Sequence, residues 1–285
     1  MKSFLFILCQ HLIPQKALSR LAGTLAECRV PWIKNPLIRW FIKTYQVDMG
    51  VAAQPEPTAY IHFNDFFTRA LTEGERPIDQ TKGAVTSPAD GCISQLGSIK
   101  NGRIFQAKGV EFSLLELVGG NPSDTKAFEE GCFATVYLSP RDYHRVHMPL
   151  SGQLQKMIHI PGDLFSVNDA TAQNVPRLFA RNERVVCLFD TDHGPMALIL
   201  VGAMIVASIE TVWAGLVTPL KKQIRYWQYP PKVISAFDKG EEIGRFKLGS
   251  TVILLLGKGV AEWEASLQTQ SSVRMGEKIG WIDAQ

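Results

Sequence analysis

Residues 245–256, RFKLGSTVILLL, contain a clear β-strand signal that a Gly-Ser pair interrupts at its start. The run Val252–Leu256 is continuously apolar, which is typical of a short strand in a protein core. Gly249 and Ser250 stand at the entry to this strand. Gly followed by Ser is a common turn, because Gly adopts backbone angles that other residues avoid. From these residues alone, an ordinary turn and a reactive serine are both open.

Further short runs of this kind begin at about Ala84 and continue to the end of the chain. They are rich in Val, Ile and Phe, and they alternate with Gly, Pro and Asp, which favour turns. The clearest are AVTSPADGCI, RIFQAKG, CFATVYLSP, VVCLFDTDHG, MALILVGAMIVASIETV and KIGWI. The sequence therefore predicts a β-rich core of many short, mostly antiparallel strands.

The residues before this core have a helical pattern instead. Apolar spacing and capping residues predict helices over 15–27, 35–46 and 64–72, with Asn35 and Asn64 as caps. A turn-rich linker, TEGERPIDQTKG, follows them. We therefore predict an α+β chain, with an N-terminal helical region at 1–75 and a catalytic core at 76–285.

The N-terminal segment is also the basic part of the chain. Residues 1–46 contain seven Lys and Arg and one Glu, although the whole chain has a net charge of only +3. This asymmetry suggests an anionic partner surface, a membrane ahead of nucleic acid. Basic helices containing Trp40 and Phe41 suit a bilayer interface, while packing on the protein's own core is the alternative. The longest apolar run, 196–207, is too short to span a bilayer.

Metal and disulfide chemistry find little support in the sequence. The five cysteines form no CxxC pair, which argues against a zinc ribbon or a disulfide framework. His144 and His147, with Asp142 nearby, are the best metal-ligand candidates, but HExxH is absent. We therefore expect no metal site.

Acyl chemistry is the stronger possibility. An Asp that orients a His, and a His that deprotonates a Ser, form a triad whatever their order in the chain. Asp90, His147 and Ser250 have these chemical types, and all three lie at strand ends or in loops, where catalytic residues concentrate. Because Gly249 has no side chain, its carbonyl is open to attack by the hydroxyl of Ser250.

These motifs resemble those of the bacterial phosphatidylserine decarboxylases, a family of membrane-associated pyruvoyl enzymes. The resemblance covers nearly the whole chain, although the first 60 residues match mainly in character. It depends on FNDFFTR at 63–69, SPADG at 87–91, YLSPRDYHRVHMP at 137–149, PGDLFSVN at 161–168, LFARNERV at 178–185 and LGST at 248–251.

The resemblance implies a self-processing mechanism. Ser250 would attack the Gly249 carbonyl, with His147 as the base and Asp90 orienting it, and would itself become a covalent pyruvoyl group. Cleavage between Gly249 and Ser250 would leave a β chain of 1–249 and an α chain of 250–285 that stay associated. A Schiff base between the pyruvoyl group and phosphatidylserine would then permit decarboxylation to phosphatidylethanolamine and CO₂. His144 would assist decarboxylation or reprotonation, and Ser166 would contact the substrate.

The resemblance also implies partners and a location. It predicts phosphatidylserine in an anionic membrane as substrate, a homodimer of processed protomers and no nucleic-acid partner. The protein would be peripheral, on the cytoplasmic face of the bacterial inner membrane. Two other hypotheses remain: a serine hydrolase that uses the same three residues with an intact chain, and a membrane-adsorbed β-rich binding module.

Overall fold

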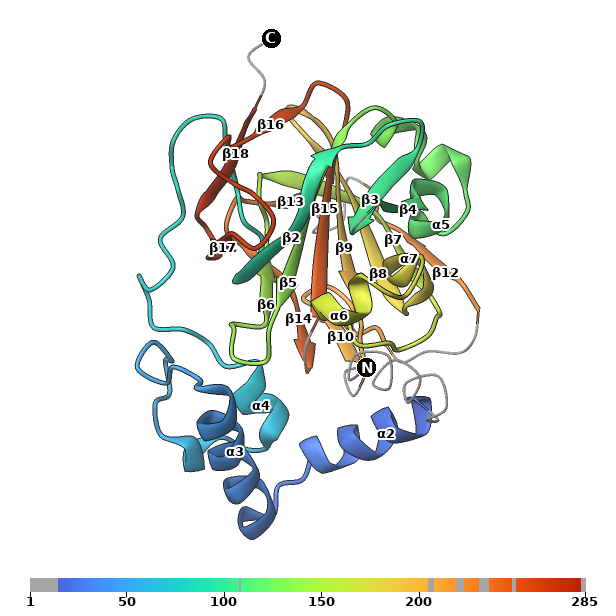
Figure 1. The fold of residues 1–285 in the computed structure, drawn as a ribbon. Coiled ribbons are helices and arrows are strands. Elements are labelled where there is room, and N and C mark those ends of the chain that lie inside the picture. The colour runs from blue at the N-terminus through green and yellow to red at the C-terminus, as the bar shows by residue number, and fades with distance from the viewer. Residues whose placement is uncertain are drawn as a thin grey trace.

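The computed structural model describes residues 15–107, 109–204, 208–218, 223–230, 236–247 and 250–282. Its two longest helices, α2 and α3, lie in the N-terminal part of the chain, and short helices also lie beside the β core, as Figure 1 shows. The helices are α2 Gln15–Ala26, α3 Pro31–Tyr45, η1 Pro57–Ala59, α4 Phe63–Phe67, α5 Leu114–Val118, η2 Pro122–Asp124, η3 Lys126–Phe128, α6 Asp169–Ala172 and α7 Leu178–Arg181.

The rest of the chain is a β core, built around one large antiparallel sheet. Its strands run in the order β12-β7-β8-β9-β15-β5-β2-β17, and β13 also pairs with β7. They are β2 Gly91–Ser98, β5 Cys132–Leu138, β7 Gly152–Ile160, β8 Arg184–Thr191, β9 Gly194–Val201, β12 Arg225–Gln228, β13 Ala236–Phe237, β15 Ser250–Leu256 and β17 Ser272–Val273.

Three smaller sheets complete the core. A four-stranded sheet has the order β11-β10-β14-β6, a three-stranded sheet the order β1-β18-β16, and β3 pairs with β4. Their strands are β1 Ala84–Thr86, β3 Arg103–Ala107, β4 Val110–Ser113, β6 Arg145–His147, β10 Ser208–Thr211, β11 Gly215–Leu216, β14 Glu242–Lys247, β16 Ala261–Trp263 and β18 Lys278–Ile282.

Strand β15 lies inside the large sheet, between β9 and β5 (Figure 1). All seven of its residues are buried. Val252 and Leu254 pack in one hydrophobic cluster and Ile253 and Leu255 in another, on the two faces of the sheet. Because successive side chains point to opposite faces, a strand covered on both faces needs apolar residues at every position. The apolar run therefore correctly predicted this strand.

The N-terminal helices differ in their limits from the sequence-based prediction. Helix α3 begins at Pro31, so Asn35 lies inside it and does not cap it. The N-cap of α4 is His62, whose side chain accepts a hydrogen bond from the Asp65 amide. Asn64 was expected to cap this helix, but its side chain instead donates a hydrogen bond to Glu27 at 2.7 Å. The predicted α+β class is nevertheless confirmed: helices precede a core of mostly antiparallel strands.

Candidate active site

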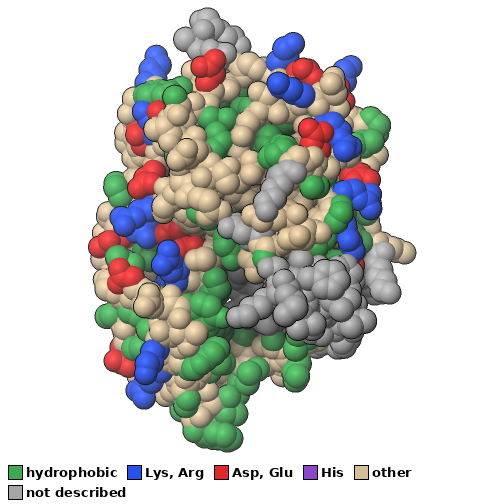
Figure 2. Space-filling model, in the orientation of Figure 1, with side chains coloured by type: hydrophobic (Ala, Val, Ile, Leu, Met, Phe, Trp, Pro, Cys, Tyr) green, Lys and Arg blue, Asp and Glu red, His purple; other side chains and the backbone are tan. Residues whose placement is uncertain are grey.

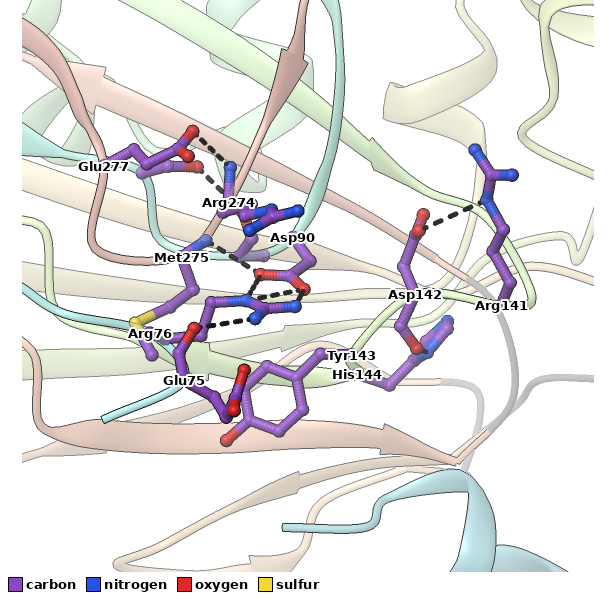
Figure 3. A network of polar contacts seen from close by, with 12 residues as sticks. Glu75, Arg76, Asp90, Arg141, Asp142, Tyr143, His144, Arg274, Met275 and Glu277 are labelled. Atoms are coloured by element: carbon purple, nitrogen blue, oxygen red, sulfur yellow. Dashed lines mark hydrogen bonds and ion pairs between the residues drawn. The ribbon is translucent and has the colours of Figure 1, made fainter. Parts of the chain in front are cut away.

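Asp90 lies in the loop immediately before β2, and an arginine from the linker region binds its carboxylate. Arg76 donates from Nε to Oδ1 at 2.9 Å and from Nη2 to Oδ2 at 2.5 Å (Figure 3). The Met275 amide also donates to Oδ1, at 2.8 Å. The Asp90 side chain is only 9% exposed, so this is a nearly buried, bidentate ion pair. Asp90 is therefore engaged from two sides, by residues distant in the sequence.

His147 is the last residue of β6, and both of its ring nitrogens have partners. Nδ1 lies 2.8 Å from the carbonyl oxygen of Gly240, and Nε2 lies 3.0 Å from the hydroxyl of Tyr143. Because a carbonyl only accepts, Nδ1 donates, and Nε2 of the neutral ring accepts from Tyr143. Burial lowers the pKa of His147 and raises the pKa of Tyr143 to about 12. The two side chains thus form a neutral pair.

His144 lies just before β6 and is fully buried. Its Nδ1 donates to the carbonyl oxygen of Asp142 at 2.8 Å, and its ring centroid is 4.0 Å from that of Phe67 in α4. Its Nε2 is buried and has no hydrogen-bond partner among the described residues. Burial lowers the pKa of His144 to about 3, so the imidazole is neutral and Nε2 carries a free lone pair. Nε2 is therefore a free hydrogen-bond acceptor, on an imidazole that is a weak base in this buried position.

Ser250 begins β15, opposite Leu138 of β5. Its side chain is buried, and within the described part of the chain Oγ has no hydrogen-bond partner. Its predicted electrophile, Gly249, lies outside the described residues. By strand alternation Ser250 shares a face with Val252, which points into the core between the large sheet and the four-stranded sheet. The hydroxyl is therefore held in a largely apolar layer.

The three residues of the predicted triad are not joined by hydrogen bonds in the described structure. His147 lies opposite Glu242 in β14, eight residues before Ser250 in the chain. The carbonyl of His144 accepts from the Phe246 amide at 3.0 Å, only four residues before Ser250. The partner of His144 on β14 is therefore nearer to Ser250 in the sequence than the partner of His147 is. The triad and the role of His144 stay predictions.

Ser166, the remaining predicted contact residue, lies in the loop between β7 and α6. Its Oγ is 3.5 Å from the Asn168 amide, at the limit of a hydrogen bond, and the residue is half-buried. The neighbouring Asn182 side chain fixes this loop by accepting from the Phe165 amide and donating to its carbonyl. The loop is thus tied to the end of α7, and the role of Ser166 stays a prediction.

Sequence reasoning missed Arg76 and Tyr143 as members of this network. Tyr143 lies inside the quoted YHRVH motif, so its proximity to His147 was a usable signal. Arg76 lies in the turn-rich linker, and no spacing or periodicity connects it to Asp90. In the described part of the chain no cluster of three or more His, Cys, Asp and Glu could hold a metal ion.

Comparison with known proteins identifies the family. The model described as phosphatidylserine decarboxylase matches residues 63–281, and a second, described as PSD, matches residues 5–46. A phosphatidylserine decarboxylase proenzyme of Azotobacter vinelandii is 62% identical over 98% of this chain and 99% of its own length. The proenzyme of Stutzerimonas stutzeri is 60% identical over 98% of this chain and 95% of its own.

A proenzyme of the same name from Pseudomonas fluorescens is 59% identical, with both chains covered completely. The matched residues include the segments that contain Asp90, His144, His147 and Ser250. The predicted decarboxylase class, a carboxy-lyase, is thereby confirmed at the level of the family. With a family model over most of its length and relatives of this similarity, the chain belongs to the phosphatidylserine decarboxylase family.

Proposed function

We propose that this protein converts phosphatidylserine into phosphatidylethanolamine and CO₂, using a pyruvoyl group made from its own Ser250. The observation that most directly supports the proposal is the environment of Ser250: a buried hydroxyl, without a partner among the described residues, at the start of β15. An unpaired buried hydroxyl costs stability, and such a cost persists where the group has a chemical task. The proenzyme names of the relatives agree with a processed chain.

Self-cleavage uses only groups of this chain and one water molecule. Ser250 Oγ attacks the carbonyl carbon of Gly249, and an ester forms as the bond to the Ser250 nitrogen breaks. Elimination then removes the proton from Ser250 Cα and breaks the bond between the ester oxygen and Cβ, which releases Gly249 as a carboxylate and leaves dehydroalanine at residue 250. Water displaces the nitrogen as ammonia and leaves a pyruvoyl group at residue 250. When present, this group supplies the electron sink for loss of CO₂, through a Schiff base with the substrate amine.

His147 is proposed as the base for the attack, with Asp90 as its orienting carboxylate. Both ring nitrogens of His147 already have hydrogen-bond partners, so this triad forms only if His147 exchanges both hydrogen bonds. His147 Nδ1 must leave the Gly240 carbonyl for Asp90, and Nε2 must leave Tyr143 for Ser250. Burial lowers the pKa of His147, which favours the neutral imidazole that a general base needs.

His144 is proposed to handle protons in the decarboxylation step. Its unpartnered Nε2 can accept a hydrogen bond from the substrate amine, and it can carry a proton to the α-carbon once the anionic substrate raises its pKa. Ser166 is proposed to contact the substrate carboxylate. Both assignments concern the processed enzyme and are therefore tested after cleavage is complete.

The N-terminal helices are proposed to hold the protein on the cytoplasmic face of the inner membrane, as a peripheral protein. Leu21 of α2 is 70% exposed and Trp32 of α3 is 78% exposed. Figure 2 shows hydrophobic side chains at the end of the molecule that α3 occupies in Figure 1. No helix in the described ranges has the length and hydropathy of a membrane span. Exposed apolar side chains among cations suit an anionic bilayer interface.

The membrane proposal is tested with a matched pair of leucines. Leu21→Ala is expected to weaken binding to vesicles of phosphatidylcholine and phosphatidylglycerol about three- to tenfold, because part of its side chain leaves the bilayer. Leu216 of β11 is 56% exposed and lies in the β core, so Leu216→Ala is the control. Equal binding by the two variants in vesicle flotation contradicts the proposed helical contact. The homodimer of processed protomers is a further proposal, and light scattering measures it.

The chemistry is tested by intact mass together with turnover of phosphatidylserine. The wild-type protein is expected to give two chains, one ending at Gly249 and one beginning with a pyruvoyl group. Ser250→Ala is expected to stay one chain and to be inactive, whereas Ser98→Ala, at an exposed position of β2, should be processed normally. Turnover by an uncleaved chain would overturn the mechanism. Absence of turnover by fully cleaved protein would overturn the proposed substrate.

A further inference from the structure

A pocket of about 310 Å³ lies between the N-terminal helical region and the β core. Its walls come from the segment after α3, the loop before β6 and the turn after β17. Four arginines line it: Arg69, Arg76, Arg141 and Arg274. Among the described residues of the lining, three carboxylates face them: Asp48, Asp90 and Asp142. These side chains give the lining a net charge of +1, at the boundary between the N-terminal helical region and the β core.

Arg69 is the unusual member of this lining. It is only 4% exposed, and its Nη2 donates to the carbonyl oxygen of Arg141 at 3.1 Å. Its Nε and Nη1 are buried and have no hydrogen-bond partner among the described residues. Its Cζ lies 5.6 Å from the centre of the Phe66 ring, which supplies only a weak attraction. Burying a cation with two unused donors is costly unless an anion approaches it.

A second buried arginine shows how this fold satisfies such a group when its role is structural. Arg184 is 2% exposed and donates from all three of its nitrogens. The acceptors are the carbonyl oxygens of Leu117, Asn182 and Glu116, at 2.6–2.8 Å. Arg184 therefore needs no ligand. Arg69, equally buried, is left with one bond of this kind.

The carboxylates of the pocket attract Arg69 electrostatically, but among the described residues none forms a hydrogen bond or ion pair with it. Asp90 is bound by Arg76, as Figure 3 shows, and Asp48 accepts from the Gly50 amide at 2.8 Å. Asp142 accepts from the Ser139 amide at 2.6 Å and forms a long ion pair with Arg141 at 3.8 Å. The Arg274 guanidinium has no hydrogen bond or ion pair within the described ranges, although its backbone amide binds Glu277. The pocket therefore offers unused donors from Arg69 and Arg274.

We propose that this pocket binds a phosphate group, with Arg69 and Arg274 as its principal donors and Arg141 at its rim. Guanidinium groups match phosphate geometrically, because two parallel N–H donors fit two oxygens of one anion. The phosphate is either the phosphodiester of a lipid headgroup or a free phosphate ion. Only the headgroup alternative depends on the proposed lipid substrate.

The binding itself is tested by titrating the full-length protein with sodium phosphate, at ionic strength held constant with sodium chloride. The wild-type protein is expected to bind, and Arg274→Gln is expected to raise the Kd about tenfold. Because Arg274 is exposed, its replacement spares the core. Arg69→Gln should weaken binding at least as much, provided circular dichroism shows that it folds. Arg103→Gln, an exposed arginine on β3, is the control and should bind as the wild type does.

A kinetic experiment distinguishes the two sources of the phosphate. If the occupant is the lipid headgroup, free phosphate competes with phosphatidylserine in mixed micelles, and Arg274→Gln raises KM for the lipid. If the occupant is free phosphate, phosphate binds without competing and KM does not change. Absence of phosphate binding by the wild type, or equal Kd values for Arg274→Gln and Arg103→Gln, overturns the proposal. The titration gives its answer even if the protein shows no decarboxylase activity.

Discussion

Strand β15 and the side-chain network around Asp90 are held in place by different forces. β15 is paired along its length with β9 and β5 and packs apolar side chains on both of its faces. The network around Asp90 depends on a few charge-assisted and neutral hydrogen bonds between loops. Stability in the first region is spread over many contacts, whereas in the second it is concentrated in a few. Concentrated interactions can exchange partners without unfolding the sheet, and the proposed self-cleavage requires such an exchange.

The largest expected effect is in the strand. Leu254→Ala should reduce the free energy of unfolding by about 2–5 kcal/mol, because it leaves a cavity in a layer that cannot collapse. Leu216→Ala, at an exposed position, should change it by less than about 0.5 kcal/mol. Urea denaturation of uncleavable Ser250→Ala protein measures both. Similar losses for the two variants would contradict the contrast between a packed strand and the exposed edge strand β11.

The next effect tests how much stability the network concentrates in one ion pair. Arg76→Gln should cost about 1.5–3 kcal/mol, since it leaves the nearly buried Asp90 with a single backbone donor. Arg103→Gln, which breaks an exposed pair with Glu111 at 3.7 Å, should cost less than about 1 kcal/mol. A double-mutant cycle with Asp90→Asn gives the coupling energy. A coupling near zero would mean that the Arg76–Asp90 ion pair contributes nothing to the free energy of unfolding.

A smaller effect is the pH dependence of stability that buried His144 causes. Burial lowers the pKa of His144 from 6.5 to about 3, so between these values the unfolded chain binds a proton that the folded chain does not. Stability should therefore fall as the pH drops from 7 to 5, by at most about 1.4 kcal/mol per pH unit from this residue. His144→Gln should reduce the slope, and His193→Gln, at an exposed position, should not. Equal slopes in the two variants would contradict the burial of a neutral His144.

The smallest effect concerns the hydroxyl of Tyr143. Tyr143→Phe removes the donor to His147 Nε2 and should cost about 1 kcal/mol. It also frees the nitrogen that the proposed triad assigns to Ser250, so chain cleavage should be at least as fast as in the wild type. Tyr226→Phe, on the exposed face of β12, is the control. Slower cleavage in Tyr143→Phe would instead make the hydroxyl a part of the processing machinery.

Local patterns in the sequence were sufficient to predict β15 and the helical start of the chain. Burial on both faces imposes an apolar residue at each position of β15, and this requirement is visible in a single run of letters. Helix limits were less accurate because capping residues have competing uses. Asn64 donates to Glu27, 37 residues away, and the chain places His62 at the cap in its stead. No rule based on neighbouring residues predicts which of the two side chains caps the helix.

The candidate site shows the same limit more strongly. Residue types and family motifs selected Asp90, His144, His147 and Ser250, but their hydrogen-bond partners could not be read from spacing. The partners are a linker arginine, a carbonyl of Gly240 and a tyrosine within the histidine motif. The Arg76 and Gly240 contacts depend on how separate segments of the chain meet, whereas Tyr143 lies only four residues from His147. A one-dimensional pattern identifies the reactive groups, and only the three-dimensional fold determines which of them touch.

The position of β15 has a consequence for any break in the backbone just before Ser250. Residues 250–282 contribute an inner strand to the large sheet and also supply β17, beside β2, and β18, beside β1. A peptide woven into two sheets in this way behaves as a complementing fragment, retained by its neighbours rather than by a covalent link. Scission there would remove the covalent link between β14 and β15 and create a new terminus inside the core. It would not create two parts that can separate while the protein stays folded.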